Sequence, residues 1–408
     1  MKYIKKIILV FVLLIAYIYA LAISAIPENI ILFQNEDLNI STIYGLNIST
    51  NNNKRASILT SSTADLKETG RYNLNISLFN VLKVKDITVD VVENISVVPV
   101  GKLAGLKLYT NGIMVVGMTE ITGQDGQKYK PHENTDIQEG DVILEVNGNS
   151  LSSSDDLMKC INECNGNEMT ILCARDNETF EVKITPVKTS TGSYKIGLWV
   201  RDSAAGVGTV TFYNPDSGLF GALGHGIVDI DTEKLIDIQS GEFVTTKIIN
   251  VIKGTSGEPG KIQGTVDNQK TIGEIYSNTI FGVYGKLTDT EALDIDETDL
   301  IPVASRNDIE TGAAKILCCV ENGEVREYDI EIKKLYLNNS SNNKSMLIEV
   351  TDEELLQKTG GIIQGMSGCP IIQNGKFIGA ITNVLVSDPT TGYAVFADMM
   401  IKELNMIN

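Results

Sequence analysis

A glycine-flanked serine, followed at once by a hairpin signal, constrains the fold of this 408-residue chain most strongly. Residues Gly365 to Pro370 read G-x-S-G-x-P around Ser367, and two apolar runs follow, separated by Asn374-Gly375. An Asn-Gly pair between apolar runs predicts a β-hairpin, because both turn residues must adopt positive φ. Glycines beside a serine let the backbone aim N–H groups at the oxygen of an attacked carbonyl. The stretch therefore indicates either a serine nucleophile before a strand pair or a plain Gly-Ser turn.

A serine nucleophile needs a base, and the chain holds only two histidines. His132 lies in a polar loop, where we expect a solvated side chain. His225 lies in an apolar stretch between Gly224 and Gly226. A structural core histidine is the alternative, but it needs no glycine on either side. His225 is therefore the predicted base, and its place before Ser367 matches the order in chymotrypsin-like proteases.

The segments Gly221 to Gly226 and Thr359 to Pro370 together resemble the stage IV sporulation protein B peptidases. These are forespore-secreted signalling serine proteases with a PDZ domain, found in endospore-forming bacteria. The resemblance extends to Gly257 to Gly264 and to the N-terminal apolar segment followed by a PDZ-like module. It implies a mainly β chain in which a PDZ domain precedes a chymotrypsin-like double β-barrel. It implies no metal and no organic cofactor.

The same resemblance assigns the third catalytic group to Asp352. The competing interpretation is that Asp352 only caps the helix expected from about Glu353 to Lys358, since Asp is a favoured N-cap residue. The predicted mechanism is covalent acyl transfer, with Ser367 attacking, His225 taking its proton and Asp352 orienting the imidazole. The N–H groups of Gly365 and Ser367 form the predicted oxyanion hole.

An uncharged run of twenty residues, from Ile7 to Ile26, follows a lysine-containing start. That length can span a bilayer with the lysines on the cytoplasmic side. A cleaved signal peptide is the alternative, because Ala20-Leu21-Ala22 is a passable cleavage site. We favour an uncleaved anchor in residues 1–26, since the run exceeds a usual signal core, and either interpretation exports the remainder. Alternating polar and apolar residues then predict a β-rich extracytoplasmic segment over 27–98.

Residues 99–188 resemble a PDZ domain. The stretch Ile137 to Gly148 holds a Gly-Asp turn, an apolar strand and an Asn-Gly turn, and Ser153 to Glu163 predicts a helix. A short stretch before the strand Ile113 to Val116 resembles the loop that receives a peptide carboxylate. Its residues are Gly105, Leu106, Lys107 and Leu108. A peptide would add to the sheet edge beside the helix. The alternative is a PDZ fold that acts as an internal clamp without a free ligand.

Short β-rich runs with many glycines occupy residues 189–408 and suggest a barrel or sandwich. The His and Ser motifs indicate a serine peptidase domain of two barrels with the active site between them, and Asp398 to Met406 reads as a closing helix. Gly254 to Lys261 resembles a phosphate loop but lacks the required Ser/Thr. It belongs to a Gly-Pro loop whose role the sequence does not reveal.

A formal net charge of −18 argues against nucleic acid as a partner, because such a surface repels phosphates. The six cysteines form no C-x-x-C pair, and with two histidines they predict no zinc site. We expect them to be small core residues.

The resemblance implies secretion into the space between the two forespore membranes, with the N-terminal helix as a membrane anchor. It implies cleavage of the protein itself and of a membrane-embedded regulator of an intramembrane metalloprotease, which then processes a sigma-factor proprotein. Two alternatives are a general envelope quality-control protease and a non-enzymatic PDZ scaffold. In the former the PDZ normally follows the protease, and the latter needs neither His225 nor Ser367.

Overall fold

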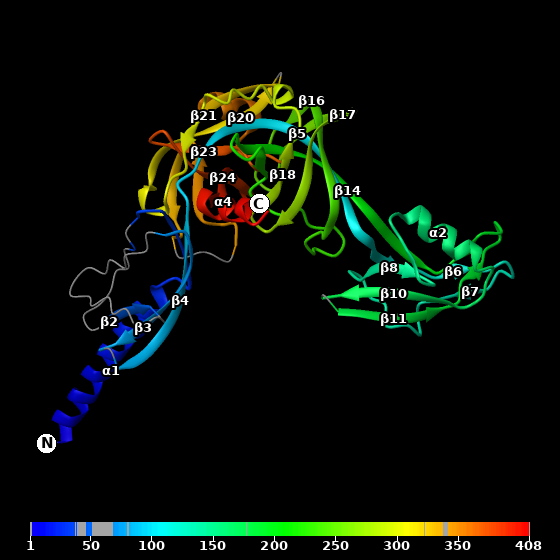
Figure 1. The fold of residues 1–408 in the computed structure, drawn as a ribbon, viewed down its shortest axis with the longest axis horizontal. Coiled ribbons are helices and arrows are strands. Elements are labelled where there is room, and N and C mark those ends of the chain that lie inside the picture. Colours follow the sequence, from blue (N-terminus) through cyan, green and yellow to red (C-terminus); the bar gives the residue numbers. More distant parts are fainter. Residues whose placement is uncertain are drawn as a thin grey trace.

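A computed structural model describes residues 2–36, 38, 46–50, 68–79, 81–176, 178–321, 323–337 and 342–407. The chain is mainly β, as predicted. A pair of β-barrels lies between an N-terminal part and a PDZ-like module, and the three form an arc (Figure 1). The parts of the predicted segment 27–98 that fall between these ranges lie outside the described residues.

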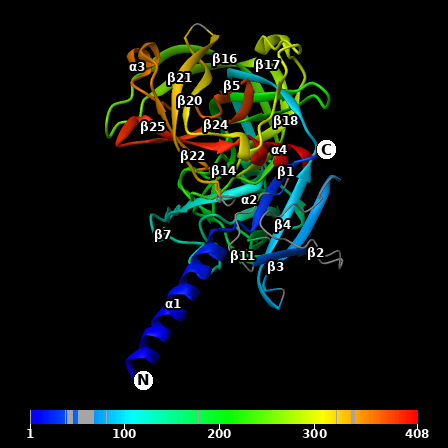
Figure 2. The same cartoon turned by 90° about the vertical axis from the view of Figure 1, so that its left-hand side faces the viewer.

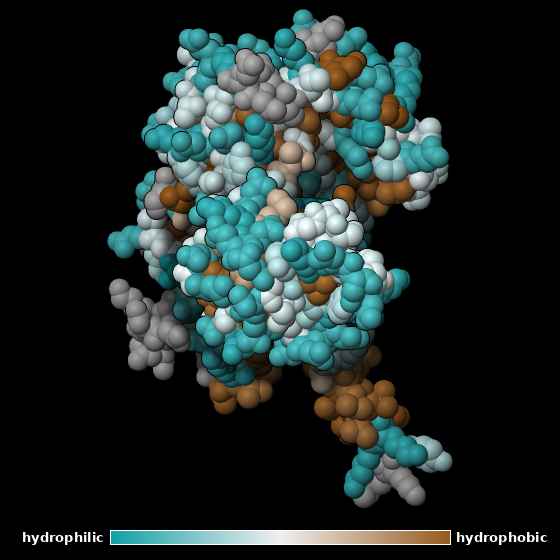
Figure 3. All heavy atoms as spheres, turned by 90° about the vertical axis from the view of Figure 1, so that its right-hand side faces the viewer, coloured by the Kyte–Doolittle hydropathy of each residue, from teal (hydrophilic) through white to brown (hydrophobic). Residues whose placement is uncertain are grey.

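The N-terminal helix α1 spans Lys2–Ala25 and projects away from the body (Figure 2). Its stretch Tyr3–Ser24 has a mean hydropathy of 2.8, and none of its residues is fully buried. Its apolar surface extends below the other domains in Figure 3. A helix of this length and composition is compatible with a membrane anchor or a signal sequence.

A four-stranded sheet follows the helix, in the order β1-β4-β3-β2. Its strands are β1 Asn29–Phe33, β2 Leu46–Thr50, β3 Gly70–Leu78 and β4 Leu82–Val92. The period-two pattern puts Leu74 and Ile76 on the buried face, where they contact the same core as the end of α1. The alternation predicted for this region is therefore confirmed.

The PDZ-like module packs one helix on a small sheet. Its elements are the second half of β5 (Ser96–Met118), β6 Ile121–Thr122, β7 Lys128–Tyr129, β8 Val142–Val146, β9 Asn149–Ser150, α2 Ser154–Glu163, β10 Met169–Arg175, β11 Glu178–Ile184, β12 Val187–Lys188, β13 Tyr194–Lys195 and the start of β14 (Leu198–Asn214). The predicted helix is α2, which Ser153 caps at its N-terminus, and its residues Leu157 and Ile161 are buried. The Gly-Asp turn is anchored by Arg175, whose Nε lies 2.6 Å from the buried Asp141 Oδ1.

Two long strands, β5 and β14, run through both the PDZ-like module and the first barrel. They pair antiparallel from Leu198↔Met118 to Tyr213↔Val98. The predicted boundary at residue 99 is therefore wrong, because the first half of β5 belongs to the barrel. Strand pairing over such a length depends on residues far apart in sequence, so no local signal marks where one unit ends.

Each barrel has six strands. The first follows the order β5-β14-β15-β18-β17-β16 and closes through β5–β16 pairing. The second is β20-β21-β22-β25-β24-β23. Their remaining strands are β15 Leu219–Ala222, β16 Ile238–Ile252, β17 Lys261–Thr279, β18 Gly282–Leu287, β20 Gly312–Glu321, β21 Glu324–Leu335, β22 Met346–Val350, β23 Pro370–Gln373, β24 Lys376–Leu385 and β25 Asp388–Phe396. Phe212 of the first barrel and Phe377 of the second lie 5.3 Å apart between ring centroids, so the barrels share a core.

Short elements complete the fold. They are β19 Ile301–Pro302, two 3-10 turns at Glu291–Leu293 and Arg306–Asp308, α3 Glu353–Thr359 and α4 Ala397–Asn405. The predicted closing helix is α4, which contacts strands of both barrels. The predicted hairpin turn is also confirmed, since Asn374 and Gly375 have φ of 52° and 75°.

Candidate active site

The loop before β23 places Ser367 between two glycines with positive φ, 102° at Gly365 and 94° at Gly368. A Cβ on Gly368 would lie 2.3 Å from the carbonyl oxygen of Thr209, so no side chain fits there. The Gly368 N–H donates to Ile381 O at 2.8 Å. These glycines therefore hold the serine loop tightly against both barrels.

Thr209, in β14 of the first barrel, fixes the serine loop from the other side. Its N–H donates to Ser367 O at 3.2 Å, and its hydroxyl donates to Gly365 O at 2.7 Å. A threonine inside a strand carries no local sign of such a role, so the sequence does not predict it.

His225 lies in the loop after β15, where Leu223 and Gly224 have φ of 69° and 68°. A Cβ on Gly226 would lie 2.6 Å from Thr279 O, and one on Gly224 would lie 3.2 Å from the side chain of Thr382. The two flanking glycines thus let the histidine loop approach its neighbours closely, in addition to freeing the ring.

The His225 ring has a defined tautomer. Its Nδ1 lies 2.8 Å from Gly226 O, and because a carbonyl only accepts, Nδ1 carries the proton and Nε2 keeps its lone pair. Burial lowers the pKa of His225 below its usual value, with the bond to Gly226 O opposing the shift. The imidazole is therefore in its basic form at neutral pH.

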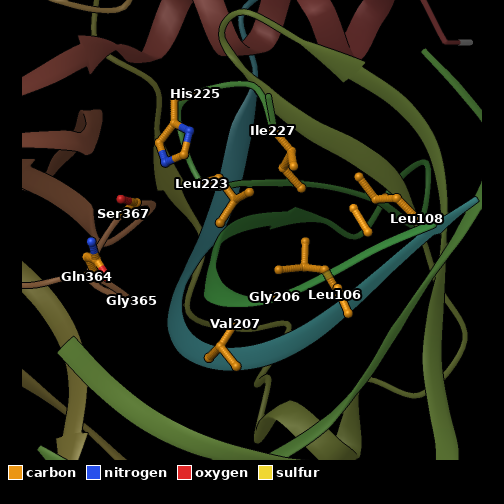
Figure 4. Close-up of a pocket in the computed structure, with 12 residues that line it drawn as sticks. Leu106, Leu108, Gly206, Val207, Leu223, His225, Ile227, Gln364, Gly365 and Ser367 are labelled. Atoms are coloured by element: carbon orange, nitrogen blue, oxygen red, sulfur yellow. The ribbon is translucent and has the colours of Figure 1, made fainter. Parts of the chain in front are cut away.

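His225 and Ser367 line one cavity of about 240 Å³ between the barrels (Figure 4). The Ser367 hydroxyl donates to Thr382 O at 2.9 Å. Within the described part of the chain, no hydrogen bond joins the serine to the histidine. Proton transfer between them therefore requires the hydroxyl to turn from Thr382 O towards Nε2.

The two predicted oxyanion donors differ from their neighbours in the loop. The N–H groups of Gln364, Met366 and Gly368 donate to Gly260 O, Ile363 O and Ile381 O at 2.9, 3.1 and 2.8 Å. The N–H groups of Gly365 and Ser367 have no acceptor among the described residues. They are available to a ligand.

The Gly-Pro loop, whose role was not evident from sequence, supports the serine loop. Gln364 donates to Gly260 O, and Ile262 N–H donates back to Gln364 O at 2.8 Å. Gly254 N–H donates to Thr359 O at 2.8 Å, and a Cβ on Gly360 would lie 2.3 Å from Gly254 O. The close approach of these backbones explains the glycines in both segments.

Asp352 lies at the N-terminus of α3. Its carboxylate accepts from Leu355 N–H at 2.9 Å and from Asp329 N–H at 3.4 Å. The ring partner of His225 is the Gly226 carbonyl. The structure therefore brings His225, Ser367 and Gly365 to one cavity and gives Asp352 capping contacts, so its place in a triad stays a prediction.

The residues predicted to receive a peptide carboxylate lie in β5 of the first barrel. Gly105 pairs with Val207 on one side and with Val244 on the other, and Leu108 pairs with Ala204 and Gly241. This prediction for Gly105, Leu106, Lys107 and Leu108 is wrong, since a strand paired on both edges has no N–H groups to offer. Leu106 and Leu108 instead line the cavity beside Ser367.

Among the described residues, no group of three His, Cys, Asp or Glu is placed to hold a metal ion. Cys369 is 1% exposed. Its sulfur lies 3.8 Å from the hydroxyl of Thr209, inside the core of the barrels. Cys369 is thus a packing residue two positions after the candidate nucleophile.

The family model described as SpoIVB peptidase S55 matches residues 192–401, just over half of the chain. A search of curated proteins found no match. The PDZ domain of the SdrC-like protein Lmo2051 from Listeria monocytogenes is 21% identical with a TM-score of 0.18, covering 22% of this chain and 87% of that one. An inactive form of the Rv3671c protease is 13% identical with a TM-score of 0.29, covering 50% of this chain and 84% of that one. The active form, from M. tuberculosis, is 16% identical with a TM-score of 0.25, covering 42% and 75%. Because this family model matches just over half of the chain, including His225 and Ser367, the chain belongs to the SpoIVB peptidase S55 family of serine peptidases.

Proposed function

We propose that this chain is a sporulation signalling serine endopeptidase with Ser367 as nucleophile and His225 as general base. The observation that carries the proposal is the placement of these two side chains, from different barrels, on one cavity. A scaffold protein needs neither group, and the family match over residues 192–401 includes both.

In the proposed mechanism, Ser367 Oγ attacks the carbonyl carbon of the scissile peptide bond while His225 Nε2 takes the hydroxyl proton. The bond from Nδ1 to Gly226 O keeps the tautomer in which Nε2 is the acceptor. The developing oxyanion accepts hydrogen bonds from the N–H groups of Gly365 and Ser367, each worth roughly 3 kcal/mol of barrier. The imidazolium then protonates the leaving amine, and water hydrolyses the acyl-enzyme.

Asp352 is proposed as the group that stabilises the imidazolium. Its carboxylate caps α3 in this conformation, so the role requires that α3 or the histidine loop shift when substrate binds. The resemblance to the family supports this assignment, and a substitution that keeps the cap tests it.

The proposed substrates are the protein itself, near its N-terminus, and a membrane-embedded regulator of an intramembrane metalloprotease. The proposed site of action is the space between the forespore membranes, with α1 as anchor. The apolar helix and the family match support an enzyme that works at a membrane surface.

The test uses the full chain in detergent micelles, as wild type and as Ser367→Ala, followed by intact mass over hours. Trimming of the wild type alone supports a self-cleaving serine peptidase, and the new termini report its specificity. Equal trimming of both would point to a contaminating protease. A preference for unfolded casein over folded substrates would favour the quality-control alternative.

A further inference from the structure

The cavity beside Ser367 reaches into the mouth of the first barrel, and most of its wall takes no part in the proposed chemistry. That wall is apolar and comes from β5, β14 and the histidine loop (Figure 4). It consists of Leu106, Leu108, Ala204, Val207, Leu223 and Ile227, with Gly206 between them.

The barrel is open here because, among the described residues, no strand pairs with one edge of β14 before Val210. Strand β15 pairs with β14 only from Val210 onwards, whereas β5 pairs along its other edge as far as Leu198. Thr209 points its backbone groups towards the open side, where its N–H meets Ser367 O and its carbonyl accepts from Leu223 N–H. Since this orientation alternates along an antiparallel strand, Val207 and Ala205 present their N–H and C=O groups to the same edge. The β14 edge at Ala205 and Val207 therefore lies next to the Ser367 loop without a strand partner among the described residues.

Two glycines of β14 differ in what surrounds them. A Cβ on Gly208 would lie 2.0 Å from Leu223 Cδ2, so packing alone requires that glycine. A Cβ on Gly206 would meet nothing within 4 Å, and Gly206 pairs with Leu106, which places both on the cavity face. The room beside Gly206 is thus space that the protein itself does not fill.

The size and the apolar lining of the cavity indicate which kind of substrate side chain it can hold. An apolar cavity of roughly 150 Å³ holds a benzene-sized molecule, so about 240 Å³ admits a large aliphatic or aromatic side chain. Among the described residues, the polar side chains on its wall are those of His225, Gln364 and Ser367, so a charged side chain would lose its hydration without an ion-pair partner there.

We propose that this cavity is the specificity subsite of the peptidase, which selects a bulky apolar residue close to the scissile bond. The substrate segment pairs as an added strand with the β14 edge at Ala205 to Val207, and its apolar side chain enters the barrel mouth beside Gly206. The inference rests on the proposed peptidase function and adds its substrate class. Gly206 is a specificity-determining residue that leaves the cavity open.

The experiment digests a peptide library with the full-length protein in micelles. The library varies each position within two residues of a cleavable bond, and mass spectrometry identifies the products. For the wild type we expect at least a tenfold preference for Leu, Met or Phe over Ala at one position, since a single methylene in an apolar pocket already discriminates about 10- to 200-fold. Gly206→Phe fills the cavity and should abolish or invert that preference, whereas Gly206→Ala should reduce it only slightly.

Ile227→Ala provides a second variant, because it enlarges the cavity from the opposite wall. It should shift the preference towards larger side chains such as Trp. If Gly206→Phe and Ile227→Ala both cleave with the wild-type preference, the subsite assignment is overturned. If Gly206→Phe does not fold, the direction of the Ile227→Ala shift decides. A wild type that cleaves no peptide and does not react with a fluorophosphonate contradicts the peptidase function itself, a different outcome from cleavage without preference.

Discussion

The two barrels meet at the candidate active site, but they are built differently there. The second barrel closes completely, and its serine loop is held by a main-chain bond at Gly368. The first barrel leaves one edge of β14 unpaired and opens an apolar mouth beside His225. In the proposed mechanism, the second barrel fixes the nucleophile, and the first barrel presents the base and receives the substrate.

The largest expected effect is on kcat, and it tests whether Asp352 of the second barrel is the triad acid. If Asp352 stabilises the imidazolium, Asp352→Asn should lower kcat by about 10⁴-fold. The midpoint of thermal unfolding should stay unchanged, because Asn is as good an N-cap as Asp. Steady-state kinetics and calorimetry on the same samples measure both quantities.

The matched control is Asp352→Ala, which removes the cap and should cost about 1 kcal/mol of stability as well. Wild-type activity in Asp352→Asn would assign Asp352 to capping alone and leave Gly226 O as the partner of His225.

Rigidity of the serine loop is tested by Gly368→Ala. The new Cβ would clash with Thr209 O at a positive φ, so we expect a loss of roughly 3 kcal/mol or more in the free energy of unfolding and no detectable cleavage. Gly375→Ala is the control, since its φ is also positive but nothing lies within 4 Å of the added Cβ. Denaturant unfolding should show about 1 kcal/mol for that variant. Equal losses would mean that backbone strain, and not the contact between barrels, limits position 368.

Parts of the fold could be predicted from the sequence because they depend on residues that are neighbours in the chain. The hairpin at Asn374-Gly375, the cap of α3 and helix α2 rest on neighbouring residues, so their signals could be identified directly. Gly105 to Leu108 was misassigned because Gly-Leu-x-Leu fits a barrel strand as well as a carboxylate loop. Only the partners on both sides, β14 and β16, distinguish the two.

In the candidate site, too, only the features that depend on neighbouring residues could be predicted from the sequence. His225 and Ser367 stand out because glycines flank them, whereas Thr209 and the apolar mouth are assembled from strands distant in sequence. The glycine pattern predicts the N–H groups of Gly365 and Ser367 as oxyanion donors, and their lack of an acceptor among the described residues is evident only from the folded loop.

Thr209 links the two barrels, and its hydroxyl bond to Gly365 O tests that link. Thr209→Val keeps the shape but loses the hydroxyl, which should cost about 1 kcal/mol of stability and lower kcat several-fold by loosening the oxyanion loop. Thr209→Ser retains the donor and should stay close to wild type. Should Thr209→Ser lose as much kcat as Thr209→Val, the methyl group rather than the bond would matter.

The smallest effect is a shift in pH dependence from the first barrel. Burial lowers the pKa of His225, so the neutral imidazole persists below the usual value of about 6.5. The acid limb of kcat/KM should therefore lie below pH 6.5. Unfolded chains bind this proton more readily, so the contribution to stability is present above the unfolded pKa and is lost as pH falls through the folded one. An acid limb above pH 6.5 would contradict a desolvated base.

The central claim is that Ser367 is a nucleophile activated by His225 across the two barrels. The most direct measurement treats the full-length protein with a fluorophosphonate and maps the adduct by mass spectrometry. We expect one adduct per chain, on Ser367, and its loss in His225→Ala with the fold retained by circular dichroism. No adduct on a folded wild type, or equal labelling in His225→Ala, would contradict it.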